Sequence, residues 1–508
     1  MNHTSLTEYF SESFALHKKK TAISFLRNGK LETKLSFIEL ENAANRMANM
    51  FLSVGVEPGD RVILFIDKSL VPVVAHLALQ KLGVISVPLN PGFKKTEMAY
   101  LLHDAQVKAI VLAPDKETFI KEIDPIPIRI VVESQKAFQD LDVVNNASDE
   151  LSTVDIQCHD PGLIIYTSGT TGKPKGAILT QQNLVSDALN IINIWELSES
   201  DTLCHALPLF HIHGLCFALH TALLAGVHVL LLDRFSPRSV IETLSRQTGD
   251  TVCTVFMAVP AMYAKLMEHI GDKDLNFKQI RLLTSGSAPL LSRDFKRIHD
   301  VFGKEPLERE GMSETGMNFS NPLKGNRKPG SIGLPLPAVD VRLVDPDTGM
   351  DVKQGQTGEI WLKGPAVTPG YWQKPEETAG VFDEGWFKTG DLGNMDTEGY
   401  YYLTDRLKHI IISGGENISP KEIEIIINQM DDILESSVVG IPDDNWGEKA
   451  VAAIVRKPGA EVGAEEIQSY CKKQLHSWKC PKEIVFVSEL PRNTMGKVLK
   501  ETVKRFFE

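Results

Sequence analysis

The sequence has few cysteines and no long hydrophobic run, and both absences narrow the classes of protein it can belong to. Its first fourteen residues, MNHTSLTEYFSESF, lack the basic and then apolar pattern of a secretory signal. The longest strongly apolar stretches, such as residues 223–232, are far too short to span a membrane. We therefore expect a cytoplasmic protein without a membrane-spanning segment. The six cysteines are scattered without a close metal-ligand pair, which favours free thiols: Cys158, Cys204, Cys216, Cys253, Cys471 and Cys480.

An excess of positive charge is also missing. Lysine and arginine number 54 against 66 aspartates and glutamates, a net charge of -12, whereas a nucleic-acid binder usually carries a basic face. The composition is otherwise ordinary for a globular enzyme, with 43% hydrophobic and 24% charged residues. A chain of 508 residues is too long for a single compact core. The sequence therefore predicts at least two domains and no nucleic-acid partner.

Short apolar runs alternate with helical patterns through most of the chain. A capping box at Ser36 and Glu39 begins a helix that the pattern extends to Gly55. Strands alternating with helices indicate an α/β fold of largely parallel sheets covered by helices, and we expect a β subdomain in addition. Strand-like runs occupy residues 61–66, 84–87, 107–112 and 252–259.

The pattern changes near Asp405. Beyond it, Ser419, Pro420 and Glu422 supply the N-cap, the first-turn proline and the capping glutamate of a helix. The apolar stripe of this helix consists of Ile423, Ile426, Ile427 and Met430. We predict three parts: an N-terminal domain over residues 1–404, a hinge at 405–408 and a small C-terminal α+β domain over 409–508.

A glycine-rich stretch, YTSGTTGKPKG, spans Tyr166 to Gly176 after an apolar run. Glycine, serine and threonine in a loop after a strand offer backbone N–H groups and hydroxyls to phosphate oxygens, and Lys173 and Lys175 add positive charge. The loop does not have the Walker spacing, in which GK[ST] follows four intervening residues. We interpret it as a phosphate-binding turn, and the alternative is a flexible surface turn.

Four further stretches occur in order along the chain, and with the glycine-rich loop they resemble the adenylate-forming superfamily. That superfamily includes acyl-CoA synthetases, adenylation domains of peptide synthetases and luciferases. The resemblance covers nearly the whole chain. It implies that the protein activates a small carboxylic acid with ATP and Mg²⁺ to an acyl-adenylate, and then transfers the acyl group to coenzyme A. The stretches are EGMSETG at residues 310–316, WFKTGDLG at 386–393, DRLKHIIISGGENISP at 405–420 and PRNTMGK at 491–497.

The resemblance also implies roles for individual residues. Lys497 falls on the catalytic lysine, Glu314 on the magnesium ligand, and Lys408 on the pivot about which the C-terminal domain rotates after the adenylate has formed. Gly414 and Gly415 fall on the loop that lines the pantetheine tunnel for coenzyme A. Nucleotide-binding positions are Thr167, Ser168, Gly169, Thr170, Thr171, Gly172, Lys175, Ser287, Ala288, Glu310, Gly311, Met312 and Ser313, with Asp391 and Arg406 at the ribose.

The chemistry of the reaction accounts for two of these residue types. A carboxylate that attacks the α-phosphate of ATP brings two anions together and builds charge on the bridging oxygen. A lysine such as Lys497 offsets this repulsion with a preorganised positive charge, and a carboxylate such as Glu314 holds Mg²⁺ against phosphate oxygens. The alternatives are a solvated lysine near the C-terminus and a carboxylate that only caps a turn.

The segments that predict the acyl pocket resemble the malonyl-CoA synthetase branch of the superfamily. On that resemblance, His211, Ser287 and Arg309 hold the free carboxylate of malonate or methylmalonate. A second anion inside a pocket must be paired to be tolerated, and the planar fork of an arginine suits that task. In the alternative, Arg309 forms a structural ion pair and His211 is a packed gate residue. The segments are PLFHIHG at residues 208–214, SGSAPLL at 285–291 and LEREGM at 307–312.

Glu310 departs from the family pattern. Relatives usually carry an aromatic residue there that packs on the adenine, and a glutamate cannot stack, so we expect altered nucleotide binding. If residues 307–310 form a strand, Arg309 and Glu310 face opposite sides and need not neutralise each other.

Three other functions fit parts of the sequence. The first is an acyl-CoA synthetase for a monocarboxylic acid, from acetate or propionate to longer chains, which an apolar pocket without a paired arginine would favour. The second is an adenylation module that passes its product to a carrier protein, although no carrier domain follows Lys497. The third is a non-catalytic nucleotide-binding relative, which the joint presence of Glu314, Asp391, Arg406 and Lys497 disfavours.

Overall fold

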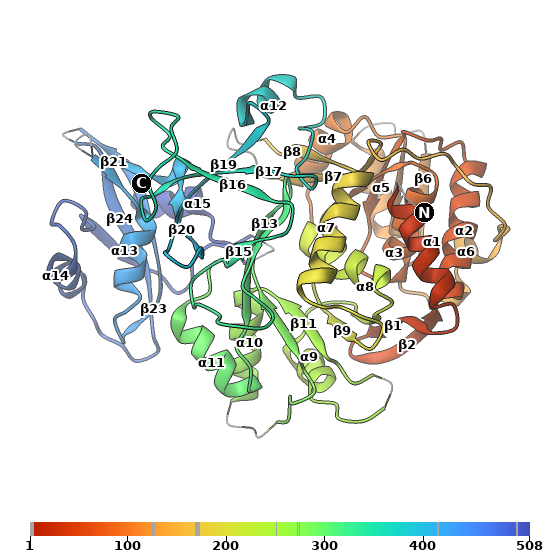
Figure 1. The fold of residues 1–508 in the computed structure, drawn as a ribbon, viewed down its shortest axis with the longest axis horizontal. Coiled ribbons are helices and arrows are strands. Elements are labelled where there is room, and N and C mark those ends of the chain that lie inside the picture. The colour runs from red at the N-terminus through yellow and green to blue at the C-terminus, as the bar shows by residue number, and fades with distance from the viewer. Residues whose placement is uncertain are drawn as a thin grey trace. The chain divides into compact units, whose positions relative to one another are not determined.

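The computed structural model describes residues 5–123, 128–167, 173–249, 251–271, 273, 275–413, 416–444, 446–493 and 496–508. The chain forms two compact units (Figure 1). The first comprises Met1–Asp340 with Lys363–Phe387, and the second comprises Val341–Leu362 with Lys388–Glu508. The second unit includes residues on both sides of the hinge expected at 405–408, and that hinge stays a prediction.

The first unit contains a six-stranded sheet in the order β6-β5-β3-β4-β7-β8. Neighbouring strands from β6 to β7 run parallel, and β7 and β8 form an antiparallel hairpin at one edge. Buried apolar side chains such as Ile63, Val87 and Ile164 belong to its core. The strands are β3 (Arg61–Phe65), β4 (Ile85–Pro88), β5 (Ala109–Leu112), β6 (Ile128–Val131), β7 (Pro161–Thr167) and β8 (Lys175–Thr180).

A nine-stranded sheet in the same unit has the order β15-β14-β13-β12-β11-β9-β10-β1-β2. Its inner strands from β13 to β1 run parallel, so the carboxyl ends of β12 and β13 point to the same edge of the sheet. Strand β2 at one end of the sheet, and β14 and β15 at the other end, are antiparallel to their neighbours. The bounds are β1 (Thr21–Arg27), β2 (Lys30–Ser36), β9 (Thr202–His205), β10 (His228–Leu232), β11 (Val255–Ala258), β12 (Leu282–Ser285), β13 (Leu307–Met312), β14 (Gly316–Ser320) and β15 (Leu334–Pro335).

Helices connect these strands, so the expected α/β fold with largely parallel sheets is confirmed. The capping box at Ser36 and Glu39 is formed. Its helix ends at Ser53 rather than at Gly55, which has a left-handed φ of 84° that a helix cannot continue. The helices are α1 (Leu6–Leu16), α2 (Phe37–Ser53), α3 (Leu70–Lys81), α4 (Lys95–Asp104), α5 (Pro114–Lys121), α6 (Asp142–Asn145), α7 (Gln181–Ile194), the π-helix η2 (His213–His220), α8 (Thr221–Leu224), α9 (Pro237–Leu244), α10 (Pro260–Ile270), α11 (Ser292–Phe302) and α12 (Pro375–Val381).

The second unit contains strands of two sheets. In the first of them β17 lies between β16 and β19, and β20 pairs antiparallel with β19, which matches the expected β subdomain. The other has the order β22-β21-β24-β23, with β25 parallel to β24. The bounds are β16 (Asp340–Val344), β17 (Gly358–Lys363), β19 (Trp386–Met395), β20 (Tyr401–Arg406), β21 (Ile411–Ser413), β22 (Glu416–Ile418), β23 (Ile433–Asp443), β24 (Gly447–Arg456) and β25 (Glu483–Phe486). The short strand β18 (Phe382–Asp383), which pairs with the start of β19, consists of residues of the first unit.

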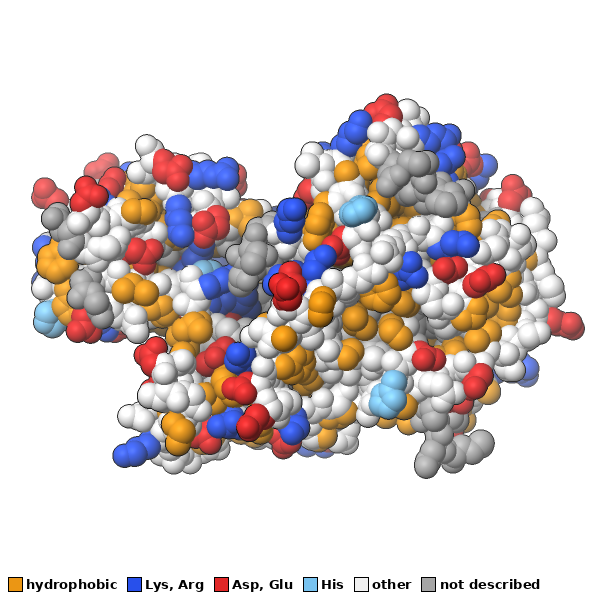
Figure 2. Space-filling model, turned by 90° about the horizontal axis from the view of Figure 1, so that it is seen from above, with side chains coloured by type: hydrophobic (Ala, Val, Ile, Leu, Met, Phe, Trp, Pro, Cys, Tyr) orange, Lys and Arg blue, Asp and Glu red, His pale blue; other side chains and the backbone are white. Residues whose placement is uncertain are grey.

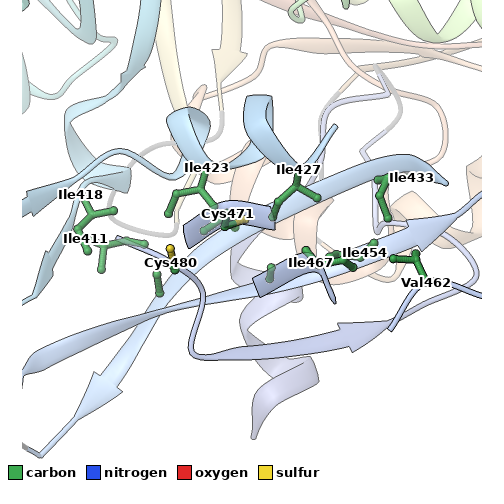
Figure 3. Close-up of a cluster of buried hydrophobic side chains, with 13 residues drawn as sticks. Ile411, Ile418, Ile423, Ile427, Ile433, Ile454, Val462, Ile467, Cys471 and Cys480 are labelled. Atoms are coloured by element: carbon green, nitrogen blue, oxygen red, sulfur yellow. The ribbon is translucent and has the colours of Figure 1, made fainter. Parts of the chain in front are cut away.

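Helices α13 (Pro420–Ile427) and α14 (Ala464–Gln474) contribute side chains to a small hydrophobic core together with the sheet that contains β23 and β24. Helix α15 (Lys500–Lys504) follows near the C-terminus. Ser419 caps α13 as the sequence predicts, since its side chain accepts a hydrogen bond from the backbone N–H of Glu422. Figure 3 shows Ile423 and Ile427 pointing into the cluster that also contains Cys471 and Ile454. All six cysteines are free thiols, as expected.

The distribution of surface side chains and the character of the helices can be compared with what the composition predicts. Acidic, basic and apolar side chains are interspersed over the face of the described residues that Figure 2 presents. Among those residues, none of the helices combines the length and the apolar character needed to cross a bilayer.

Candidate active site

The glycine-rich loop connects the two strands of the β7–β8 hairpin. Thr167 and Lys175 are paired across this hairpin, and the Thr167 hydroxyl donates to the Lys175 carbonyl oxygen at 3.4 Å. The predicted phosphate contacts Ser168, Gly169, Thr170, Thr171 and Gly172 lie outside the described residues. The structure therefore describes the two ends of the loop, at Thr167 on β7 and Lys175 on β8.

A buried carboxylate, Asp104 at the end of α4, ties both ends of this loop to one point. It accepts hydrogen bonds from the hydroxyls of Tyr166 at 2.8 Å and Tyr100 at 3.1 Å, and it forms a 2.5 Å ion pair with Lys374. The same Tyr100 hydroxyl also lies 2.9 Å from the carbonyl oxygen of Pro174, so its single proton is shared between the two acceptors. Burial, together with the nearby carboxylate, raises the pKa of Tyr166, so its hydroxyl stays a donor. This anchor was not apparent from the sequence, because Asp104 belongs to no motif.

Glu314 lies beside the start of the loop, in the turn between β13 and β14. Its Oε1 accepts hydrogen bonds from the Thr167 hydroxyl at 3.3 Å and the Tyr371 hydroxyl at 3.2 Å. The Lys175 ammonium group lies 5.4 Å from the centre of the Tyr371 ring. Burial and the charge of Glu314 raise the pKa of Tyr371. Two residues that were predicted to act on the phosphates and the metal are therefore in contact, although their motifs are far apart in sequence.

The donor set around Glu314 suits Mg²⁺ better than a metal held entirely by protein. Among the described residues there is no cluster of three or more His, Cys, Asp or Glu side chains that could enclose a metal ion. Mg²⁺ is usually held by one or two carboxylates together with substrate phosphates and water. A single carboxylate beside the loop that is predicted to bind phosphate fits that coordination.

Arg309, on β13, is a buried cation. Only 3% of its surface is exposed, and none of its three guanidinium nitrogens has a hydrogen-bond partner among the described residues. The guanidinium carbon lies 5.1 Å from the centre of the Phe217 ring. A Cβ added to Gly286 would come within 2.6 Å of its Nε, so glycine is needed there. Burial lowers the pKa of Arg309 to about 10, against the opposing charges of Glu310 and Asp187, so it remains a cation at neutral pH.

Two histidines of the segment 208–214 are neutral. Burial lowers the pKa of His211 to about 4, and burial together with the Arg309 charge lowers the pKa of His213 well below its usual value. The Nε2 atoms of both rings lack a partner within the described part of the chain. His213 Nδ1 lies 3.4 Å from the hydroxyl of Ser287. The sequence predicted His211, Ser287 and Arg309, and it missed His213, although His213 stands two residues after His211 in the same motif.

Ser287 follows β12 with a left-handed φ of 67°. Such a conformation is uncommon for a residue with a side chain and usually persists where the surrounding structure requires it. Because β12 and β13 are parallel neighbours, Ser287 and Ala288 follow one strand while Gly311, Met312 and Ser313 lie at the end of the next. Predicted nucleotide and acyl contacts are thereby gathered at the same edge of the sheet.

Glu310 is held by a side chain that sequence reasoning did not single out. The Asn318 amide donates to Glu310 Oε2 at 3.0 Å and to the Thr315 hydroxyl at 2.8 Å. The expected strand forms, with Arg309 buried and Glu310 half-buried. Their charges nevertheless interact, because Glu310 supports the charged state of Arg309.

The remaining predicted residues lie in the second unit. Asp391 and Arg406 are directly paired across β19 and β20. Arg406 Nε lies 2.6 Å from Asp391 Oδ1, and its second nitrogen donates to Oδ2 at 3.3 Å. The two residues predicted at the ribose thus form one bidentate ion pair, a geometry that fixes both side chains.

Lys497 shares this unit with the Asp391–Arg406 pair. Its residue is exposed to solvent, but neighbouring protein atoms remove part of the hydration of the ammonium group, which lowers the pKa of Lys497 to about 8. The charges of Arg406, Lys408 and Lys500 also lower this pKa, and Asp391 opposes them. Residues from the ribose, hinge and C-terminal motifs therefore lie close enough to interact electrostatically.

Lys408 lies in the short 3-10 helix Leu407–His409, where burial and then the Arg406 charge lower its pKa. Gly414 and Gly415, predicted at the pantetheine tunnel, lie outside the described residues. The flanking strands β21 and β22 pair antiparallel, with Ser413 opposite Glu416. The roles predicted for Lys408, Gly414 and Gly415 stay predictions.

Comparison with known proteins decides the family. Residues 10–372 match the AMP-binding enzyme family, and residues 422–497 match the AMP-binding enzyme C-terminal domain. The chain belongs to the AMP-binding enzymes. It is an ATP-dependent acyl-CoA ligase, as the motifs predicted.

Relatives align with almost the whole chain. The long-chain-fatty-acid–CoA ligase of Bacillus subtilis is 33% identical over 98% of this chain and 93% of its own length. The mitochondrial malonate–CoA ligase ACSF3 of Xenopus laevis is 33% identical over 84% of this chain and 80% of its own. The ATP-bound crystal structure of MatB from Rhodopseudomonas palustris has a TM-score of 0.92 at 36% identity, with 99% of each chain covered. The names of these relatives differ in the acid, so family membership alone does not identify it.

Proposed function

We propose that this ligase activates malonate, or the closely similar methylmalonate, and converts it into the coenzyme A thioester. The observation that carries this proposal is the buried guanidinium of Arg309, which has no hydrogen-bond partner among the described residues and lies close to Phe217 and Gly286. A buried cation of this kind is stabilised when an anion enters and pairs with it. A dicarboxylic acid can present one carboxylate to Arg309 and keep the other for the reaction with ATP.

The two neutral histidines support a carboxylate at this position. A neutral imidazole carries one N–H donor, and the unpartnered Nε2 atoms of His211 and His213 can each direct that donor to a carboxylate oxygen. The contact with Ser287 orients the His213 ring from its Nδ1 side. These groups provide hydrogen bonds, while Arg309 provides the charge. The 33% identity with a malonate–CoA ligase adds to the case.

In the first half-reaction, a carboxylate oxygen of the acid attacks the α-phosphorus of ATP. The bond from that phosphorus to the oxygen shared with the β-phosphate breaks, and pyrophosphate leaves with the electron pair. Glu314 would hold Mg²⁺, which neutralises phosphate charge when bound. Lys497 would place its ammonium group between the carboxylate and the phosphate, where a fixed charge lowers the barrier most. Thr167 and Lys175 would hold the phosphates, and Asp391 and Arg406 the ribose.

In the second half-reaction, the sulfur of coenzyme A attacks the acyl carbon of the adenylate. AMP leaves with the electron pair of the acyl–oxygen bond, and the thiol proton passes to solvent. We propose that residues 409–508 rotate about Lys408 between the two steps, which withdraws Lys497 and brings Gly414 and Gly415 to the pantetheine arm. Hinges at the ends of secondary-structure elements commonly absorb such changes.

A turnover panel tests the proposal. Malonate, methylmalonate, succinate, acetate, propionate and benzoate are each supplied with ATP and Mg²⁺, with coenzyme A present or absent, and pyrophosphate, AMP and thioester are measured. We expect malonate or methylmalonate to have the highest kcat/KM, and thioester to form only with coenzyme A. Preferential use of acetate, propionate or benzoate would contradict the dicarboxylate assignment. Adenylate formation without transfer to coenzyme A would point to a carrier protein as the acceptor.

A further inference from the structure

A second buried charge lies near Arg309 and belongs to no motif. Asp187, on α7, has only 5% of its surface exposed. Its Oδ1 accepts a 2.8 Å hydrogen bond from the backbone N–H of Met317, on the strand next to that of Arg309. A Cβ added to Gly316 would come within 2.7 Å of the same oxygen, so β14 passes directly against this carboxylate. Asp187 is therefore held in place by the antiparallel pair that also carries Arg309.

The groups that face Asp187 are few. Arg309 attracts its negative charge across β13 and β14. On η2, Cys216 interacts with Asp187, since burial and then the Asp187 charge raise the pKa of its thiol. The other titratable residues on elements packed against α7 are Glu8, Tyr9 and Glu12 of α1, Lys175 of β8, and His213 and His220 of η2. The charge of Arg309 favours the ionised form of Asp187.

The charge balance of the pocket changes when a dicarboxylate enters. Of the buried groups, the Arg309 cation and the Asp187 anion together carry no net charge without substrate, while Glu310, which also attracts Arg309, is only half-buried. A carboxylate that pairs with Arg309 would leave a second buried anion close by without a counter-charge, and burying such a charge is strongly unfavourable. Adding one proton to Asp187 removes the excess negative charge and leaves the neutral pair of Arg309 and substrate.

We infer that binding of the dicarboxylic acid is accompanied by uptake of one proton at Asp187, which makes this residue a determinant of acid specificity. The inference rests on the proposed function, because it needs a second carboxylate on the substrate. A monocarboxylic acid such as propionate places its only carboxylate at the reacting centre. Arg309 then keeps Asp187 as its counter-ion, and no proton is taken up there.

In the protein without substrate, Asp187 changes its ionisation state near neutral pH. Burial raises the pKa of Asp187 to about 7, although the Met317 N–H and the charge of Arg309 both favour the ionised form. Once a carboxylate neutralises Arg309, one of these two opposing influences is removed, and the pKa of Asp187 rises further. Above about pH 7 the proton must therefore be taken from solution, and dicarboxylate binding weakens as pH increases.

The test compares two acids and three proteins across pH. The ratio of kcat/KM for malonate to that for propionate is measured from about pH 6 to about pH 9, because titrations shared by both reactions cancel in this ratio. For the wild type we expect the ratio to fall toward tenfold per pH unit above about pH 7, the slope for one proton. Asp187→Asn, which has the shape and charge of the protonated carboxyl, should make the ratio nearly independent of pH. Glu12→Gln, an exposed change on α1, should keep the wild-type slope.

A second measurement does not depend on the variant folding well. Calorimetric titration of the wild type with malonate near pH 8, in buffers of different ionisation enthalpy, should show uptake of about one proton more than titration with propionate. Equal proton uptake for both acids, or an unchanged slope in Asp187→Asn, would overturn the inference while leaving malonate as a substrate. Absence of malonate turnover at every pH would instead remove the proposed function itself.

Discussion

Arg309 and Arg406 differ in their burial and in whether their guanidinium groups are paired. Arg309, in the first unit, is 3% exposed and has no hydrogen-bond partner among the described residues. Arg406, in the second unit, is partly exposed and forms a bidentate ion pair with Asp391. Arg406 is neutralised by a carboxylate that it contacts directly, whereas Arg309 has only the charges of Glu310 and Asp187 nearby and no hydrogen bond to either.

The difference indicates different uses. A guanidinium that is already paired mainly positions its partner and adds modest binding energy at a partly solvated site. A buried guanidinium without a direct partner gains most when an anion arrives, so it discriminates strongly between acids that supply the anion and acids that do not. We expect changes at Arg309 to alter the choice of acid, and changes around Arg406 to alter use of the nucleotide.

The largest expected effect follows from removing the unpaired cation. In Arg309→Ala the kcat/KM for malonate should fall far more than that for propionate, and the ratio should change by about 10⁴, because the substrate carboxylate is then buried without a counter-charge. Arg309→Lys keeps the charge but loses the planar fork and should give an intermediate ratio. Steady-state kinetics with both acids measure this ratio. If the ratio stays constant, Arg309 does not contact the acid.

Lys497 lies in the second unit, and we expect its substitution to lower the rate of adenylate formation rather than to change which acid is preferred. In Lys497→Ala, adenylate formation measured by pyrophosphate exchange should fall roughly 10²- to 10³-fold, the usual effect of losing one preorganised charge. Thioester formation from supplied malonyl-adenylate should be largely retained, because that step does not use the ammonium group. Lys473→Ala, an exposed lysine change on α14, is the matched control. Equal loss of both half-reactions would contradict the assigned role.

The lowered pKa of Lys497 predicts an upper pH limit for the rate of adenylate formation. Because its pKa is lowered to about 8, the ammonium form predominates below that pH and is lost as pH rises through it. The rate of adenylate formation should therefore fall by up to about tenfold per pH unit above pH 8. Lys408→Gln removes one of the neighbouring positive charges and should move this limit to higher pH. A limit that stays in place would show that another group controls it.

The smallest effect is expected at the paired arginine. Arg406→Lys keeps a positive charge near Asp391 but loses the second hydrogen bond of the fork. The KM for ATP should rise by about threefold to tenfold, as expected for one charge-assisted hydrogen bond at a partly exposed site. The malonate-to-propionate ratio should not change. A change in that ratio would show that Arg406 also influences the preference for the acid, which we assign to Arg309.

Local patterns predicted much of the fold. The alternation of strands and helices, the capping box at Ser36 and the capped helix after Ser419 all depend on residues within a few positions of one another. The end of α2 was placed too late, because the helical periodicity continues to Gly55 while its backbone turns left-handed. The chemical types in the motifs likewise indicated Arg309, Glu314 and Asp391 before any contact was known.

The sequence by itself determined the family, the reaction type and the residue types available at the site, because these are carried by short motifs whose chemistry is local. Only the tertiary structure decided which of these groups are paired. The contact of Thr167 with Glu314, the anchoring of the loop by Asp104, and the approach of Asp187 to the strand beside Arg309 join residues far apart in the chain. Such contacts depend on how the sheets and helices pack, and burial decides whether a charge is neutralised by the protein or by its substrate.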